Sequence, residues 1–162
     1  MSGVATFPEQ NGVEGFVEFI DTYKGCRVKA IFSKLPAGKH GFHIHKAGDL
    51  RGEGCQGACD HYHKGPETQH GGPPTRQGPR HTGDLGNIGP APYTKIYYLE
   101  NVSVSELYGR SVIVHADEDD LGKGHEEDSL TTGHSGKRIG CAIIGRATQD
   151  SCGKKTRKAK QV

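Results

Sequence analysis

The sequence has few large apolar side chains. Hydrophobic residues make up 32% of its 162 residues, aromatic residues only 7%, and there is no tryptophan. The 25 glycines contribute no side chain that could be buried. A chain of this length fits one domain, so the hydrophobic core of that domain must be thin. We therefore expect a bound metal ion or a disulfide bond to supply part of the stability.

Long hydrophobic runs are also missing. No segment approaches the roughly 20 apolar residues of a membrane-spanning helix. Residues 1–10 do not show the basic start and apolar stretch of a secretory signal. These absences predict a cytoplasmic protein without a membrane partner.

Strong charge of one sign is absent from most of the chain. The net charge is only +2, although basic residues gather between Lys154 and Lys160. We expect residues 1–150 to form the folded domain and residues 151–162 to be a basic, disordered tail. Such a tail could touch nucleic acid, but a solvated chain end is the commoner case, and we predict no nucleic-acid partner.

Helical periodicity is nearly absent, and short segments with the residue types and alternation of strands follow one another. Turns rich in glycine, proline and asparagine separate them, which favours an all-β antiparallel sandwich or flattened barrel. The predicted strands are residues 15–20, 27–32, 41–46, 93–99, 102–107, 110–115 and 140–147.

Two long connections interrupt this pattern. The first runs from about residue 47 to residue 92 and contains most of the eight prolines, and the second runs from residue 116 to residue 137. Loops of this length are uncommon in compact domains unless they carry function. Because they hold most of the candidate ligands, we predict that they form the walls of an active site.

Histidine is abundant, with ten residues, and several have the spacing of metal ligands. Strand alternation places His43 and His45 on one face of their strand and Phe42 on the other, and it turns His115 outward on a later strand. Imidazole suits copper and zinc, and a carboxylate joined to imidazoles suits zinc. We expect these residues to form two metal sites that share a ligand. Further candidates in the first loop are His61, His63, His70, His81 and Asp84.

Five motifs, in this order, resemble those of the copper-zinc superoxide dismutases. They are GFHIH at 41–45, HGGP at 70–73, HTGDLGN at 81–87, DDLGKG at 119–124 and RIGCAIIG at 138–145. The resemblance extends over about residues 12–147. It implies an eight-stranded Greek-key β-sandwich and an antioxidant enzyme that converts superoxide anion into oxygen and hydrogen peroxide. The implied cofactors are one redox-cycling copper ion and one structural zinc ion per subunit.

The resemblance also assigns the ligands residue by residue. The implied copper ligands are His43, His45, His61 and His115. The implied zinc ligands are His61, His70, His81 and Asp84. His61 would bridge the metals and carry a proton during catalysis.

His63 is an alternative bridge, because it would share a face with His61 if the chain were extended there. We favour His61, since it lies six residues after Cys55 and directly before an aromatic residue, as in the family. The segments between His61 and His70 and between His70 and His81 are longer than is usual in the family, which leaves the geometry of this loop open.

Other roles follow from the same resemblance. Arg138 would attract and orient superoxide, and Asp119 would link a copper ligand to a zinc ligand. Residues that would guide the substrate are Lys123, Glu127, Asp128 and Thr132. Thr131 stands where many members have a lysine.

The resemblance implies a disulfide between Cys55 and Cys141. Cys59 could pair wrongly with Cys55, bind metal or remain a free thiol, and we favour the free thiol. We also expect Cys26 and Cys152 to stay free. We also expect His40, His125 and His134, which have no role implied by the resemblance, to be surface residues.

A homodimer is implied by an apolar patch that many members share. The corresponding residues here are Phe16, Gly48, Tyr108, Gly109 and Ile144. Arg146 departs from the pattern, since an aliphatic residue usually stands there. A copper-delivery protein and a catalytically silent relative are the alternative functions. The first is expected to lack a copper ligand or to carry a separate thiol-rich module, and the second to lack a copper ligand, but all four implied copper ligands are present and no such module is seen.

Overall fold

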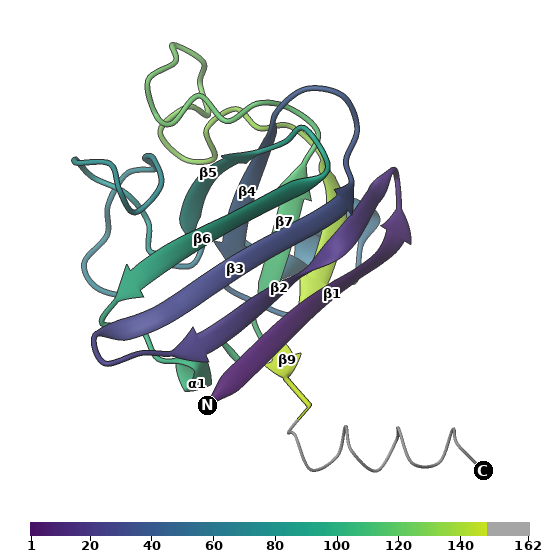
Figure 1. The fold of residues 1–162 in the computed structure, drawn as a ribbon. Coiled ribbons are helices and arrows are strands. Elements are labelled where there is room, and N and C mark those ends of the chain that lie inside the picture. The colour runs from purple at the N-terminus through teal and green to yellow at the C-terminus, as the bar shows by residue number, and fades with distance from the viewer. Residues whose placement is uncertain (149–162) are drawn as a thin grey trace.

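Alternating apolar residues give the first strands one buried and one exposed face. The computed structural model describes residues 1–148. In β3 (Gly25–Lys34), every second residue from Cys26 to Phe32 is buried. This strand pairs with β2 (Val13–Asp21) and β6 (Tyr93–Glu100), while β1 (Ser2–Gln10) and β9 (Gly145–Arg146) complete a five-stranded sheet in the order β6-β3-β2-β1-β9 (Figure 1).

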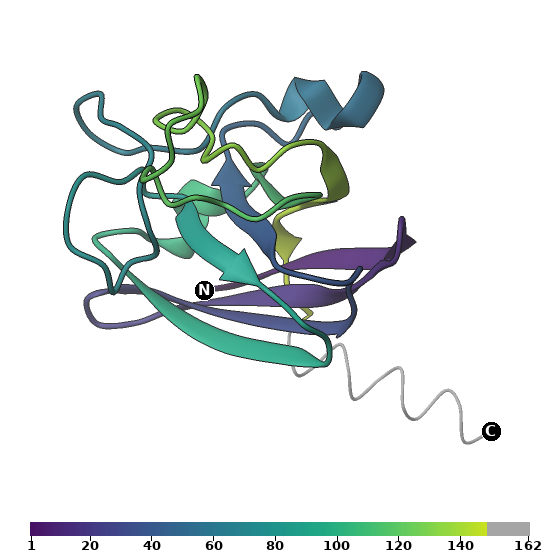
Figure 2. The ribbon, with the colours of Figure 1, turned by 90° about the horizontal axis from the view of Figure 1, so that it is seen from above.

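The second sheet is buried on both of its faces at its centre. It has the order β5-β4-β7-β8, and all residues of β4 (His40–His45) and β7 (Ser111–His115) are buried. The flanking strands are β5 (Asp84–Ile88) and β8 (Arg138–Ile143). One face packs on the five-stranded sheet, and the two long loops lie over the other face (Figure 2). The predicted all-β sandwich is therefore confirmed.

Aromatic rings fill the space between the two sheets. The ring centroids of Phe7 and Phe32 lie 5.4 Å apart, and those of Phe32 and Phe42 lie 5.8 Å apart. Phe42 projects from β4 and reaches Tyr97 of β6, 6.2 Å away. The inner face of β4 is thus fixed by packing, which also fixes the direction in which its alternate residues point.

The structure corrects the predicted strands in four places. The prediction missed β1, whose inward positions include the small Gly3 and Ala5 and which contains Pro8, a residue that cannot donate to a sheet ladder. It also missed β5, which lies inside the predicted first loop. The predicted final strand is divided, because β8 pairs with β7 while β9 crosses to pair with β1 in the other sheet. These two pieces count as one strand in an eight-stranded sandwich.

The fourth correction concerns residues 102–107, which contain a short helix, α1 (Val104–Leu107), instead of a strand. Ser103 precedes the helix, and Glu106 accepts a hydrogen bond from its backbone N–H at 2.7 Å. This Ser-x-x-Glu pattern is a helix-start signal that was present in the sequence. The other helix is the 3₁₀ segment η1 (Glu53–Ala58). Within residues 1–148, neither helix has the length or apolar character to cross a membrane.

Two predictions about exposure are wrong. His40 was predicted to lie at the surface but is only 2% exposed, because its ring is enclosed by the carbonyls of Pro36, His115 and Ala116. Ile144 was predicted to contribute to an interface but is 1% exposed and packs in the core. Its neighbour Ile143 is the exposed one, at 49%.

Candidate metal centre

Three histidines meet on the outer face of the second sheet. His43 and His45 come from β4 and His115 from β7, and all three are at most 3% exposed. The ring centroid of His115 lies 4.8 Å from that of His43 and 5.6 Å from that of His45. Their positions follow from the strand alternation that sends Phe42 and Val114 into the core.

The fourth imidazole of this cluster comes from the first loop. His61 pairs with His45 through an isolated antiparallel bridge, and the next residue, Tyr62, donates its backbone N–H to the carbonyl of Ile44 at 2.8 Å. The loop therefore runs along β4 and stacks the His61 ring on that of His43, with centroids 4.0 Å apart. One potential ligand atom from each of the four residues lies within 4.8 Å of the others.

A second cluster adjoins the first and contains Asp84, which is fully buried. Its Oδ1 lies 2.8 Å from Nδ1 of His61 and 3.0 Å from Nδ1 of His70. Its Oδ2 lies 3.4 Å from Nδ1 of His81. By distance alone His43 also joins His61, His70 and Asp84, whereas His81 stands slightly farther out.

Both clusters contain ring nitrogens without a hydrogen-bond partner. Six buried imidazole nitrogens have no hydrogen-bond partner within residues 1–148: Nδ1 of His43, His70 and His81, and Nε2 of His45, His61 and His115. The Nδ1 of His70 is close to Asp84 but is not aligned for a hydrogen bond. Buried polar atoms are rarely left unpaired, because each costs about 1–3 kcal/mol. Nitrogen lone pairs that converge in this way fit copper and zinc ions as the missing partners.

In His45, His115 and His81, the ring nitrogen that is not among these six contacts a backbone carbonyl. His45 is bound at Nδ1 by the carbonyl of Cys59 at 2.8 Å, and His115 at Nδ1 by the carbonyl of Gly136 at 3.1 Å. His81 faces the carbonyl of Thr68 through Nε2 at 3.2 Å. Such contacts select the tautomer that leaves the other nitrogen free to bind a metal.

Asp119 connects the two clusters. Its Oδ2 accepts a hydrogen bond from Nε2 of His43 at 2.7 Å, and its Oδ1 accepts one from Nε2 of His70 at 2.8 Å. Asn87 fixes the Asp119 backbone on both sides, at 2.7 and 2.9 Å. Gly133 lies directly over the carboxylate at a positive φ, and a Cβ there would collide with it. Asp119 thus joins the imidazole of His43 to that of His70.

Burial keeps the imidazoles of the first cluster neutral. It lowers the pKa of His43 and His45 well below the usual value, helped by the neighbouring imidazoles, and it lowers the pKa of His115 to about 3. For Asp84, burial alone would raise the pKa, but the hydrogen bond from His61 and the close approach of the His70 and His81 imidazoles outweigh this effect and hold the pKa far below its usual range. Neutral imidazoles and a charged carboxylate are the forms that bind metal without releasing protons.

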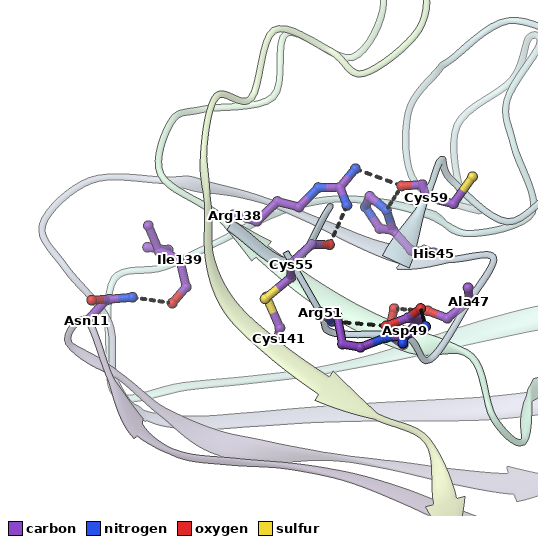
Figure 3. Close-up of a disulfide and its surroundings, with 11 residues drawn as sticks. Asn11, His45, Ala47, Asp49, Arg51, Cys55, Cys59, Arg138, Ile139 and Cys141 are labelled. Carbon is purple, nitrogen blue, oxygen red and sulfur yellow. Dashed lines mark hydrogen bonds and ion pairs between the residues drawn. A yellow bond between two sulfur atoms is a disulfide. The ribbon is translucent and has the colours of Figure 1, made fainter. Parts of the chain in front are cut away.

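Arg138 lies beside the first cluster and is fixed by η1 and the residue that follows it (Figure 3). Its guanidinium donates to the carbonyls of Cys55 at 2.8 Å and Cys59 at 2.6 Å. Cys55 forms a disulfide with Cys141, as predicted, over a separation of 86 residues. The disulfide ties η1 to β8, the strand on which Arg138 lies. The Cys59 carbonyl therefore contacts both Arg138 and His45, and it fixes the position of the guanidinium relative to that imidazole of the first cluster.

A cavity of about 880 Å³ leads to His45, His61, His81, His115 and Arg138. Of the predicted guidance residues, Asp128 and Thr132 line it, but Lys123 and Glu127 are exposed elsewhere on the second loop. Lys137 lines the cavity and was missed, although its place directly before Arg138 was a usable signal.

The remaining candidate ligands and thiols have other surroundings. Both ring nitrogens of His63 are engaged, since Nε2 donates to the Pro66 carbonyl at 2.8 Å and Nδ1 accepts from the Thr82 N–H at 3.1 Å. His63 thus ties the lengthened part of the first loop to the residue after His81. Cys26 is a buried free thiol, whose pKa burial raises to about 11, and Cys59 is an exposed one. Cys152 lies outside the described residues.

A β-sandwich that gathers five imidazoles and one carboxylate into two adjoining clusters, with the sixth imidazole of His81 3.4 Å from that carboxylate, defines a binuclear metalloprotein with nitrogen-rich sites. The family model described as copper/zinc superoxide dismutase matches residues 13–144. The chain belongs to this family. It is accordingly an enzyme of antioxidant defence that disproportionates superoxide and uses copper and zinc as cofactors.

Individual relatives agree with this assignment. The chain is 44% identical over 149 residues to a Cu-Zn superoxide dismutase of Paramecium bursaria Chlorella virus 1, a match that covers 86% of this chain and 76% of the relative. It is 40% identical over 152 residues to Cu-Zn superoxide dismutase 3 of Arabidopsis thaliana, with 90% of both chains covered. The crystal structure of the clock protein EA4 is similar, with a TM-score of 0.77, 30% identity, and coverage of 90% of this chain and 94% of the other.

Proposed function

We propose that copper is held by His43, His45, His61 and His115, and that zinc is held by His61, His70, His81 and Asp84. The observation that carries this assignment is the set of six unpaired, buried imidazole nitrogens. The four in the first cluster converge near Arg138, whereas those of His70 and His81 face Asp84. His61 belongs to both clusters, because its Nε2 is unpaired and its Nδ1 faces Asp84 at 2.8 Å.

Copper, when bound, supplies the one-electron redox chemistry of dismutation, and zinc supplies charge without redox chemistry. One superoxide loses an electron and leaves as oxygen, while a second gains that electron and two protons and leaves as hydrogen peroxide. Arg138 binds the anion through a guanidinium that two carbonyls hold in place. His61 would carry one of the protons at Nε2 whenever that nitrogen is not bound to copper, and water would supply the other. Asp119 positions His43 and His70, and the Cys55–Cys141 disulfide positions Arg138.

Superoxide decay in the presence of the copper- and zinc-loaded protein tests this proposal. A chelator removes the contribution of free copper, and the protein loaded with zinc alone is the control. We expect copper-dependent decay that His115→Ala abolishes, because that variant loses a ligand from β7 without disturbing the core. Full activity of His115→Ala, with a normal copper content, would contradict the copper assignment.

We also infer a homodimer, formed through Phe16, Gly48, Tyr108 and Gly109, together with the exposed Ile143. A Cβ on Gly48 would contact both Gly109 and Ile143, so these residues are adjacent. The guanidinium of Arg146 lies 5.3 Å from the Tyr108 ring, where a cation–π contact reduces the cost of placing its charge at this patch. A solution mass equal to one chain at micromolar concentration would contradict the dimer.

Three further statements stay predictions. The division into a domain of residues 1–150 and a basic tail of residues 151–162 depends on a segment that lies outside the described residues. Limited proteolysis with mass spectrometry would test it. A cytoplasmic location is testable by cell fractionation, and the lack of nucleic-acid binding by a salt-dependent binding assay.

A further inference from the structure

The cavity in front of Arg138 is lined by charges of both signs, and most of them have partners. The ammonium of Lys46 lies 3.9 Å from the carboxylate of Asp60. Asp128 lies 2.6 Å from the imidazole of His134. Arg138 keeps its charge, but carbonyls fix its guanidinium in place. The charge of Arg138 thus acts on an approaching anion from a fixed position, while the paired charges partly cancel one another's fields.

Lys137 is the remaining cation of the wall. It is exposed, it lines the cavity, and it directly precedes Arg138. It takes part in none of the ion pairs found within residues 1–148. Its carbonyl accepts the Ala116 N–H at 2.7 Å, so its backbone is anchored where the second loop re-enters the sheet. Glu67, an acid of the lining that has no ion-pair partner within residues 1–148, belongs to the first loop.

We propose that Lys137 attracts superoxide toward Arg138 in this chain, the task that sequence resemblance assigns to Lys123. Superoxide is a small univalent anion, and a cation beside the mouth of a cavity raises the local concentration of such an anion. Lys123 carries the same charge on the same loop but does not line the cavity. This inference depends on the proposed function, because it requires that superoxide reacts in this cavity.

The test compares Lys137→Gln and Lys137→Glu with Lys123→Gln, which removes an equal charge outside the cavity. All proteins are loaded with copper and zinc and checked for equal metal content. A unit charge about 10 Å from an anion in water changes its local concentration about twofold. We expect kcat/KM for superoxide to fall about twofold in Lys137→Gln and about fourfold in Lys137→Glu at low salt. Both losses shrink above about 0.15 M ionic strength, where the charges are screened.

A binding measurement separates attraction of the anion from turnover. The dissociation constant of azide, a univalent anion, is measured from the visible spectrum of the copper-loaded proteins. We expect azide to bind about twofold more weakly to Lys137→Gln and unchanged to Lys123→Gln. Equal effects of the two substitutions, or no effect of Lys137→Gln on either readout, would overturn the role of Lys137. A wild-type protein that binds azide but does not consume superoxide would instead contradict the proposed function, while the azide comparison would still decide the role of Lys137.

Discussion

The two faces of β4 are equally buried but buried for opposite reasons. Phe42 and Ile44 pack between the sheets in a cluster of hydrophobic side chains. His43 and His45, which alternate with them, lie under the two long loops, and each has one ring nitrogen without a partner. The inner face therefore stabilises the fold by itself, whereas the outer face remains costly until a metal ion pairs its nitrogens. The comparison shows how one strand can serve both the core and the metal centre.

The largest effect is expected where the outer face loses a ligand. His45→Ala should abolish dismutation, because copper would lose an imidazole whose Nδ1 is held by the Cys59 carbonyl. The metal-free protein should keep its stability or gain some, since the substitution removes a buried, unpaired nitrogen. Activity and copper content of the loaded protein, together with denaturant unfolding of the metal-free protein, check both parts.

The matched change on the inner face is Ile44→Ala. It should lower the free energy of unfolding of the metal-free protein by about 2–5 kcal/mol, because it leaves a cavity in the core. Copper binding should persist at temperatures where the variant stays folded, since every ligand is retained. Loss of copper from folded Ile44→Ala would contradict this division of roles between the two faces. So would a loss of stability in metal-free His45→Ala as large as that in Ile44→Ala.

A smaller effect is expected from Asp119→Asn, which keeps the shape of the side chain. An amide offers one acceptor oxygen where the carboxylate serves both His43 and His70, so one imidazole loses its partner. We expect zinc affinity to fall roughly 10–100-fold, measured by competition with a chelator. Asp120→Asn is the control, because that carboxylate binds Ser129 and the Gly122 N–H instead of an imidazole. Equal zinc loss in both variants would indicate a general loosening of the loop.

The smallest effect concerns the exposed pair of Asp128 and His134 on the second loop. The hydrogen bond between them raises the pKa of His134 and lowers that of Asp128. The His134 contribution to stability is present below its unfolded pKa of about 6.5 and is lost as pH rises through the raised folded value, whereas the Asp128 contribution is present above about pH 3.9 and is lost as pH falls. The pair is thus complete between about pH 4 and 6.5.

We expect Asp128→Asn to lower the NMR titration midpoint of His134. The unfolding temperature should hardly move at any pH, because an exposed ion pair contributes little. A large change in the unfolding temperature would mean that this part of the loop is packed more tightly than its exposure indicates.

Local patterns in the sequence predicted those features that depend only on neighbouring residues. The alternation of histidine with Phe42 and Ile44 placed His43 and His45 correctly, because side-chain direction along a strand is a local property. The same reasoning failed for residues 102–107, where apolar residues also alternate. There the capping interaction of Ser103 with Glu106 and the packing of Val104 and Leu107 favour a helix.

Features that depend on the folding of distant segments could not be predicted from residue types alone. From its residue type His40 was expected at the surface, but three backbone carbonyls enclose its ring. His61 and His63 are alike in sequence, and only the pairing of His61 with His45 and the hydrogen bonds of His63 show which one enters the clusters. Likewise Lys137, and not Lys123, lines the cavity.

The sequence by itself determined the chemistry of this protein: the ligand types, their order along the chain and the family motifs that contain them. Tertiary structure decided which histidines form each cluster and which charges line the cavity. The physical reason is that a metal site is a set of distances of a few ångströms. Those distances join residues as far apart in the chain as His43 and His115, and they are set only when both loops fold over the outer face of the second sheet.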